Sequence, residues 1–203
     1  MASIVIPFRG SNGKRRLEPA PEDARAALAL AMLGDVLEAS VAVGDTIVAT
    51  EDAAAEELAV ELGVASFHDP GAGQGAAVAE ALRSLDGGPV LVVNADVPCA
   101  RPRDLLTLLG AIPPGGIALV RAADGTTNAL ALATPGLYAP LYGPRSERRL
   151  REHAARIGVA SALADIPNLA EDVDTLADLE RLGARVGRRT QDALRSLHAA
   201  LPQ

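Results

Sequence analysis

The 203-residue chain has very few aromatic residues, a single cysteine and no tryptophan. Because aromatics make up only 2% of the residues, the sequence offers no surface of stacking rings for single-stranded nucleic acid. The formal net charge of −7 also disfavours binding to DNA, to RNA and to acidic membranes. The single Cys99 excludes an intrachain disulfide and a cysteine-based zinc site. We therefore expect neither a nucleic acid nor a membrane as a partner.

Long hydrophobic runs are absent as well, since no apolar stretch approaches the length of a membrane-spanning helix. The start of the chain, MASIVIPFRG, lacks a basic leader followed by a long apolar segment, so we expect a cytoplasmic protein. Hydrophobic residues make up 49% of the chain, enough for a sizeable core. This length predicts one domain over residues 1–203, in which about 184–203 form a C-terminal helical extension.

Short β-rich runs alternate with longer segments rich in Ala, Leu, Glu and Arg. The predicted strands are Ser3–Phe8, Asp45–Thr50, Ala65–His68, Val90–Asn94, Gly116–Ala122, Asn128–Ala133 and Ala160–Ile166. The predicted helices are Glu22–Ala42, Asp52–Leu62, Gly75–Leu85, Pro102–Leu109, Ser146–Ile157, Leu176–Leu182 and Arg188–Leu201. This alternation is typical of an α/β fold, here a Rossmann-like three-layer α/β/α sandwich with a mostly parallel sheet. Because no helix separates the strands that flank DGTTN (124–128), we also expect one antiparallel addition.

A carboxylate ends one of the buried strands, in VLVVNADVPCARPRDL (90–105). Ligands of open α/β sheets bind beyond the carboxyl ends of the strands, which is where Asp96 is expected. Asp96 could instead cap the helix predicted from Pro102, but it lies early in the sequence for that role. A magnesium ion, held by one or two carboxylates and by substrate phosphates, explains its placement better.

A second group of acids lies in EDVDTLADLE (171–180). Thr175 and Asp178 resemble a capping pair, and acids just before a helix are favoured by its dipole. Capping accounts for one acid, whereas Glu171, Asp172 and Asp174 repel one another unless a positive charge lies among them. A metal role for Asp172 or Asp174 and a plain capping role both remain open at this point.

A basic, glycine-containing loop follows the first predicted strand, in PFRGSNGKRRL (7–17). Its glycines allow backbone N–H groups to approach a phosphate, and its cations include Lys14 and Arg16. It does not fit the Walker A motif, so phosphate binding and a solvated basic loop both remain open.

Two further segments, DGTTNAL (124–130) and YGPRS (142–146), offer small residues, hydroxyls and N–H groups that suit a carboxylate or a phosphate. Ser146 fits equally well as the N-cap of the helix that follows it.

Taken in order, these stretches resemble the molybdenum-cofactor guanylyltransferase type of nucleotidyltransferase. Within that group they are most similar to the 2-phospho-L-lactate or phosphoenolpyruvate guanylyltransferases of coenzyme F-420 biosynthesis. The resemblance runs from Ile4 to about Gly183, and the stretches that carry it are IPFRGSNGKRRL, RAALALAMLGDVLEA, NADVPCARPRDL, GTTNALAL, YGPRS and DVDTLADL. It implies the fold of the nucleotide-diphospho-sugar transferases. One departure is the pair Ala76 and Ala77, where the family has Leu and Asn.

The resemblance implies transfer of GMP from GTP to a three-carbon phospho-acid such as 2-phospho-L-lactate or phosphoenolpyruvate, with release of pyrophosphate. It implies catalytic roles for Lys14, Arg16 and Asp96 and nucleotide binding by Pro7, Gly10 and Lys14. It further implies magnesium (Mg²⁺) bound by Asp96, Asp172 and Asp174, and acceptor binding by Thr127, Gly143 and Ser146. The implied partners are GTP, the phospho-acid and a downstream transferase that consumes the product.

Two other functions stay open beside this one. The chain could be a nucleotidyltransferase of the same fold with another nucleotide or acceptor, or a non-catalytic module that senses a nucleotide. Ala77 stands in place of the family's Asn, so the choice of nucleotide base remains open and a non-catalytic sensor remains an alternative. The presence of Lys14, Asp96 and Asp174 argues against the sensor.

Overall fold

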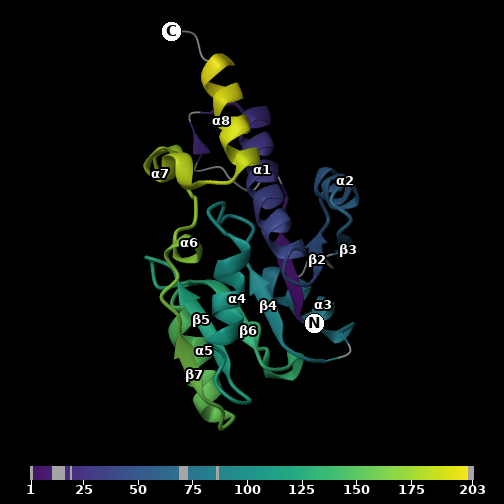
Figure 1. The fold of residues 1–203 in the computed structure, drawn as a ribbon, viewed down its shortest axis with the longest axis vertical. Coiled ribbons are helices and arrows are strands. Elements are labelled where there is room, and N and C mark those ends of the chain that lie inside the picture. The colour runs from purple at the N-terminus through teal and green to yellow at the C-terminus, as the bar shows by residue number, and fades with distance from the viewer. Residues whose placement is uncertain (1, 11–16, 19, 69–72, 86, 201–203) are drawn as a thin grey trace.

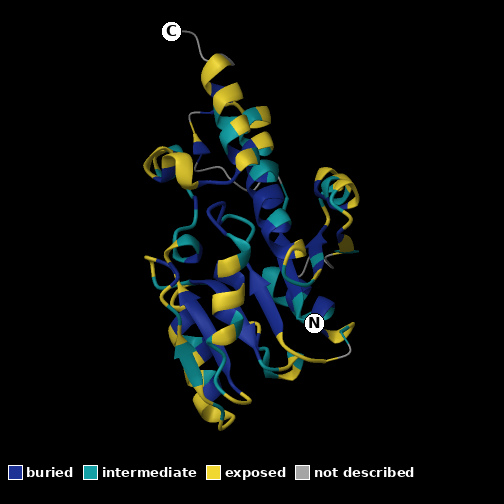
Figure 2. Cartoon of the chain, in the orientation of Figure 1, coloured by how far each residue is buried: buried dark blue, intermediate teal, exposed yellow. Residues whose placement is uncertain are grey.

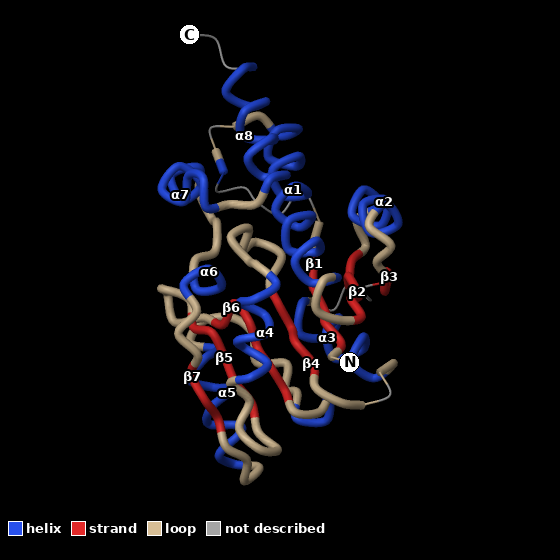
Figure 3. The backbone as a smooth tube through the Cα atoms, viewed as in Figure 1, coloured by secondary structure: helices blue, strands red, loops and turns tan. Residues whose placement is uncertain are grey.

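The structure of the chain is a computed structural model, and it describes residues 2–10, 17–18, 20–68, 73–85 and 87–200 (Figure 1). The described residues form a seven-stranded sheet in the order β3-β2-β1-β4-β6-β5-β7. Its strands are β1 (Ser3–Phe8), β2 (Asp45–Thr50), β3 (Ala65–His68), β4 (Val90–Val93), β5 (Ile117–Arg121), β6 (Thr127–Leu132) and β7 (Ser161–Leu163). Figure 3 shows these strands side by side, from β3 at one edge to β7 at the other.

Helices link most of the strands. They are α1 (Glu22–Val41), α2 (Ala53–Glu61), α3 (Gln74–Arg83), α4 (Pro102–Gly110), α5 (Ser146–Arg156), α6 (Pro167–Ala170), α7 (Leu176–Leu182) and α8 (Arg188–Ala200), with short 3-10 turns at Pro135–Leu137 and Gly183–Arg185. None of the described helices is long and apolar enough to cross a membrane. The predicted elements are confirmed to within a few residues at their ends. Two differences lie near the last strand: β7 ends at Leu163, three residues before the end of the predicted strand Ala160–Ile166, and the short helix α6 was not predicted.

Strand direction is mixed, as the missing helix between two of the strands predicted. β1 pairs in parallel with β2 and β4, whereas β6 runs antiparallel to both β4 and β5. The antiparallel strand therefore lies inside the sheet and not at its edge. This arrangement leaves β4, which precedes Asp96, in the middle of the sheet.

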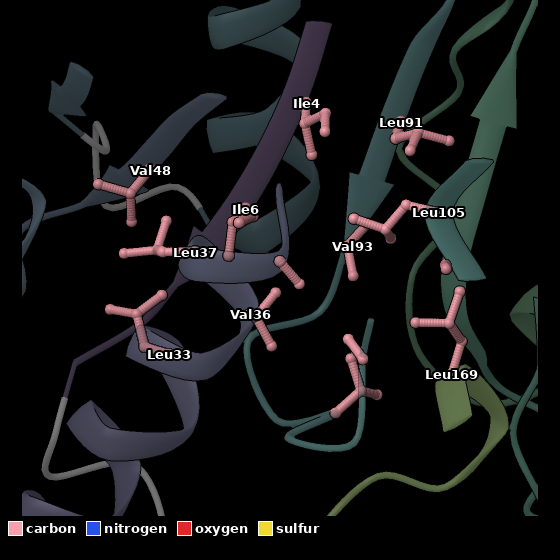
Figure 4. Packing of buried hydrophobic residues seen from close by; sticks show 14 of the residues in the cluster. Ile4, Ile6, Leu33, Val36, Leu37, Val48, Leu91, Val93, Leu105 and Leu169 are labelled. Carbon is pink, nitrogen blue, oxygen red and sulfur yellow. The ribbon is translucent and has the colours of Figure 1, made fainter. Parts of the chain in front are cut away.

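Both faces of the sheet are covered by helices, which gives the three layers. On one face, β1 and β4 pack against α1, α4 and α6, through residues such as Ile6, Leu33, Leu105 and Leu169 (Figure 4). On the other face, α3 and α5 contribute Val78, Ala81, Leu82, Leu150 and Ala154. Burial on both faces is the physical reason that the central strands are nearly continuous apolar runs (Figure 2).

A third apolar cluster joins α1 to α7 and α8, where α8 lies along α1 (Figure 1). It includes Leu28, Met32, Leu179 and Leu197, and Cys99 is buried within it. Burial raises the pKa of the Cys99 thiol, which disfavours the reactive thiolate. Cys99 is therefore a small core residue.

Candidate active site

Three carboxylates converge at the carboxyl end of the sheet. Asp96 follows β4, and Asp172 and Asp174 lie in the extended segment before α7. One carboxylate oxygen from each lies within 4.8 Å of the others. The structure thus brings together the three acids that the resemblance assigned to one metal site, and their role as metal ligands stays a prediction.

Local packing explains why the two segments meet. Val173 is fully buried in the third apolar cluster, and its N–H donates to the carbonyl oxygen of Asp96 at 2.9 Å. Because neighbouring side chains of an extended segment point in opposite directions, Asp172 and Asp174 share the side away from Val173. The Asp-Val-Asp pattern therefore presents two carboxylates toward the third.

The electrostatics of this acidic cluster favour a cation. The pKa of Asp172 is raised above its ordinary value. Burial is the largest cause, and the charges of Asp96 and Asp174 raise the pKa further, although a hydrogen bond from Asn128 lowers it. Like charges at this separation destabilise the ionised state of the group unless a positive charge lies among them. Three carboxylates supply the hard oxygen ligands that Mg²⁺ prefers, so the donor set fits a divalent cation.

Helix capping does not account for these acids. In α7, Thr175 Oγ1 accepts from the N–H of Asp178 at 3.2 Å, and Asp178 Oδ2 accepts from the N–H of Thr175 at 2.9 Å. In α4, the corresponding acid is Asp104, which accepts from the N–H of Arg101 at 3.0 Å. The capping alternative for Asp96 is therefore wrong, while the capping pair predicted at Thr175 and Asp178 is confirmed.

The loop expected to hold the nucleotide is described only at its start. Pro7 is a buried residue of β1, in register with Ala49 of β2. Gly10 has a φ of 108°, a conformation that favours glycine, and a Cβ there would lie 3.2 Å from Asp52 Oδ2. The backbone thus passes close to the N-terminus of α2, which Asp52 caps. Lys14 and Arg16 lie outside the described residues, so their predicted roles remain predictions.

The residues expected to bind the acceptor come together from two elements. Ser146 Oγ donates to Thr127 Oγ1 at 3.3 Å, and both side chains are almost fully buried. Gly143 lies in the turn before α5, where its carbonyl accepts from the N–H of Ser146 at 3.0 Å. Its φ of 101° again favours glycine.

The same turn decides the alternative role of Ser146. Arg145 occupies the N-cap position of α5 in a left-handed conformation, with a φ of 58°, and Ser146 is the first helical residue. Among the described residues no side chain caps this helix, so the capping role proposed for Ser146 is wrong. A non-glycine residue held in this conformation is often found where a loop is shaped for function.

Sequence reasoning missed the polar residues that surround the acidic cluster. Asn94 and Asn128 each follow or interrupt an apolar strand, a signal that could have drawn attention to them. Gln74 opens α3 and donates from Nε2 to Asn94 Oδ1 at 2.9 Å. Ala77 is fully buried, and the side-chain amide at the start of this helix belongs to Gln74.

A family model described as "Guanylyl transferase CofC like" matches residues 2–201. The chain belongs to this family. Phosphoenolpyruvate guanylyltransferase from Nocardia farcinica is 39% identical, over 90% of this chain and 83% of the relative. The relative of that name from Streptomyces scabiei is 35% identical over 94% of each chain. A 2-phospho-L-lactate guanylyltransferase from Natrialba magadii is 34% identical, over 87% of this chain and 80% of the relative.

Solved structures agree with the family at the level of the fold. A nucleotidyl transferase from Methanothermobacter thermautotrophicus matches with a TM-score of 0.64 at 19% identity, over 97% of this chain and 99% of its own. A candidate nucleotide-diphospho-sugar transferase from Desulfovibrio desulfuricans G20 matches with a TM-score of 0.73 at 17% identity, over 98% and 95%. The predicted fold, the family and the class of enzyme, a nucleotidyltransferase, are confirmed.

Proposed function

We propose that this member of the CofC-like family transfers GMP from GTP to the phosphate of phosphoenolpyruvate, 2-phospho-L-lactate or a similar three-carbon phospho-acid, in coenzyme F-420 biosynthesis. An acceptor phosphate oxygen forms a bond to the α-phosphorus of GTP. The bond from that phosphorus to the bridging oxygen breaks, and pyrophosphate leaves. The observation that carries the proposal is the acidic cluster at the carboxyl end of β4, in a chain 33–39% identical to several guanylyltransferases.

The protein has little proton transfer to perform, because a phosphate acceptor is already ionised near neutral pH. Its main task is to orient the two substrates in line and to balance their negative charge. Asp96, Asp172 and Asp174 would hold Mg²⁺, which when bound neutralises the crowded phosphate oxygens. The loop with Pro7, Gly10, Lys14 and Arg16 would bind the triphosphate by N–H groups and cations.

The acceptor site would use Thr127, Gly143 and Ser146. Ser146 donates to Thr127, so the Thr127 hydroxyl still has its own hydrogen to donate to a carboxylate or phosphate oxygen. Neutral donors cost less to desolvate than further cations. They suit a small anion beside a bound divalent cation.

The proposal also covers the organisation and setting of the enzyme. Residues 1–203 would act as one domain, with 184–203 as a helical extension; the packing of α8 along α1 supports this. The enzyme would work in the cytoplasm and pass its product to a downstream transferase.

The test is incubation of the purified protein with GTP, Mg²⁺ and each phospho-acid in turn, with pyrophosphate release as the readout. Parallel reactions with ATP, CTP and UTP establish the base preference. Release that requires both GTP and one phospho-acid supports the proposal. Turnover with another nucleotide or acceptor assigns a different reaction of this fold, and GTP binding without any turnover assigns a sensor.

A further inference from the structure

Three carboxamide side chains form a continuous chain beside the acidic cluster, and we call them the amide relay. Gln74 donates to Asn94 at 2.9 Å, and the Nδ2 of Asn94 lies 3.5 Å from Asn128 Oδ1. The N–H of Asn94 also donates to the carbonyl of Asn128 at 2.9 Å. Asn128 Nδ2 in turn donates to Asp172 Oδ1 at 3.1 Å. The relay thus runs from the start of α3, across β4 and β6, to one carboxylate of the cluster.

A β-bulge directs Asn128 to this position. Along β6, Val120 of β5 pairs with Ala129, but the next residue, Arg121, pairs with Thr127, so Asn128 is skipped. An extra residue of this kind bends the strand and re-aims a side chain.

The packing of β6 shows what the bulge changes. Leu130 and Leu132 belong to the cluster on the α5 face, and Ala129 and Ala131 to the cluster on the α6 face. Strict alternation would therefore turn Asn128 toward α5. Instead its amide donates to the carbonyl of Ala170 at the end of α6 and to Asp172.

Asn128 is 2% exposed, and a buried amide is costly unless its hydrogen-bonding groups have partners. Its Nδ2 donates to both Ala170 and Asp172, at 3.2 and 3.1 Å, and its Oδ1 faces Asn94. An apolar residue would be the cheaper choice inside β6, where every residue is buried. The amide therefore has a purpose that packing does not supply.

Neutrality is the property that distinguishes Asn128 from a lysine or an arginine in this place. A cation bound to Asp172 would fix the carboxylate but would also cancel charge that a metal ion needs. A neutral N–H donor orients the carboxylate and leaves its charge in place. Groups behind metal ligands commonly act in this way.

We propose that Asn128 is a positioning residue that aims the Asp172 carboxylate at a divalent cation, and that Asn94 and Gln74 hold Asn128 in place. This inference rests on the proposed function, because it requires that the acidic cluster binds a metal ion. It assigns Asn128 no direct contact with either substrate.

The test measures the binding of Mn²⁺, as a probe for Mg²⁺, to the full-length protein without substrates, by electron paramagnetic resonance of the free ion. Asn128→Ala is expected to raise the Kd for Mn²⁺ by roughly 10- to 100-fold, the usual effect of losing a group behind a metal ligand. Asn168→Ala is the matched control, since Asn168 Nδ2 donates to Asp104 at 2.9 Å in a helix cap and not in the cluster. The control should leave the Kd at the wild-type value, even where it lowers stability.

Asn94→Ala provides a second variant that does not open the core of β6, and it should weaken Mn²⁺ binding in the same direction but less. If Asn128→Ala does not fold, the Kd of Asn94→Ala for Mn²⁺ tests the inference in its place: an unchanged Kd overturns it. A folded Asn128→Ala that binds Mn²⁺ as tightly as wild type overturns the inference, as does a wild-type protein that binds no Mn²⁺. Pyrophosphate release in the same preparations separates the two proposals. If the wild-type protein releases pyrophosphate and Asn128→Ala binds Mn²⁺ as tightly as wild type, the relay alone is refuted. If Asn128→Ala binds Mn²⁺ more weakly but the wild-type protein releases no pyrophosphate, the relay is supported and the proposed reaction is refuted.

Discussion

Replacing Asp96 by asparagine should stabilise the metal-free protein while abolishing its activity. Asp96 carries one of three charges whose carboxylate oxygens lie within 4.8 Å of one another. At an effective dielectric constant of about 20, two like charges at that distance repel by about 3 kcal/mol. Asp96→Asn removes two such repulsions and keeps an oxygen acceptor in place. Because the side chains are only partly buried and salt screens their charges, we expect a net gain of about 1–2 kcal/mol in the free energy of unfolding.

The assay is thermal unfolding after treatment with a chelator, with and without added Mg²⁺. A gain of this size corresponds to an increase in Tm of roughly 2–8 °C for a chain of this length. Mg²⁺ should raise the Tm of the wild-type protein, because a ligand that binds only the folded state stabilises it. The same addition should leave Asp96→Asn nearly unchanged, and pyrophosphate release should be lost. A variant that is less stable than wild type without metal, or that keeps its response to Mg²⁺, would refute the assignment of a repulsive metal site.

Three further variants test other parts of the structure. Asp35→Ala leaves the N–H groups of Arg189 and Thr190, each 2.9 Å from its carboxylate, without their acceptor at the start of α8. Urea denaturation should then show a loss of about 2–3 kcal/mol, and a loss under about 0.5 kcal/mol would contradict this capping role. Ser146→Ala should raise the KM for the phospho-acid about tenfold with the KM for GTP unchanged; lower thermal stability alone would make Ser146 a structural residue. For Asp178, burial raises the pKa, but hydrogen bonds from the side chain and backbone of Thr175 outweigh it and hold the pKa below 3.8. Its contribution is therefore present above that pH and lost as the pH falls through the lowered value. The deficit of Asp178→Ala in urea denaturation should accordingly shrink from pH 7 to pH 3, and a constant deficit would contradict the capping pair.

The sheet was predictable because local patterns sufficed for it. Runs such as VLVV (90–93) are apolar on both faces, and the helices between them dictate parallel pairing. The position of Asp96 was predictable for a related reason, whereas its grouping with Asp172 and Asp174 was implied only by the family resemblance. Ligands of such sheets lie at the carboxyl ends of the strands, and an Asp-Val-Asp segment with a buried valine presents two acids on one side.

The amide relay and the cap on α8 were not predictable, because both depend on contacts between segments far apart in the chain. The direction of Asn128 follows from a bulge, and alternation along β6 points it to the opposite face. Asp35 lies 154 residues before its partner Arg189, and nothing in the sequence of α1 indicates that it caps another helix. Register and tertiary approach decide such cases, and single-sequence patterns carry little information on either.

The acidic cluster and the amide relay lower the stability of the metal-free protein, whereas the apolar core raises it. Apolar side chains stabilise the core, whereas the acidic cluster concentrates negative charge and Asn128 buries an amide in an apolar strand. A bulge that turns Asn128 away from its default face is a further departure from regular pairing. Each of these features raises the free energy of the metal-free protein, and all of them meet at Asp172. If a divalent cation binds there, its binding energy offsets these costs in the state that reacts. The metal-free protein should therefore tolerate the loss of an acid better than the loss of an amide, because removing a charge relieves repulsion whereas removing Asn128 leaves Asp172 and Ala170 without their donor.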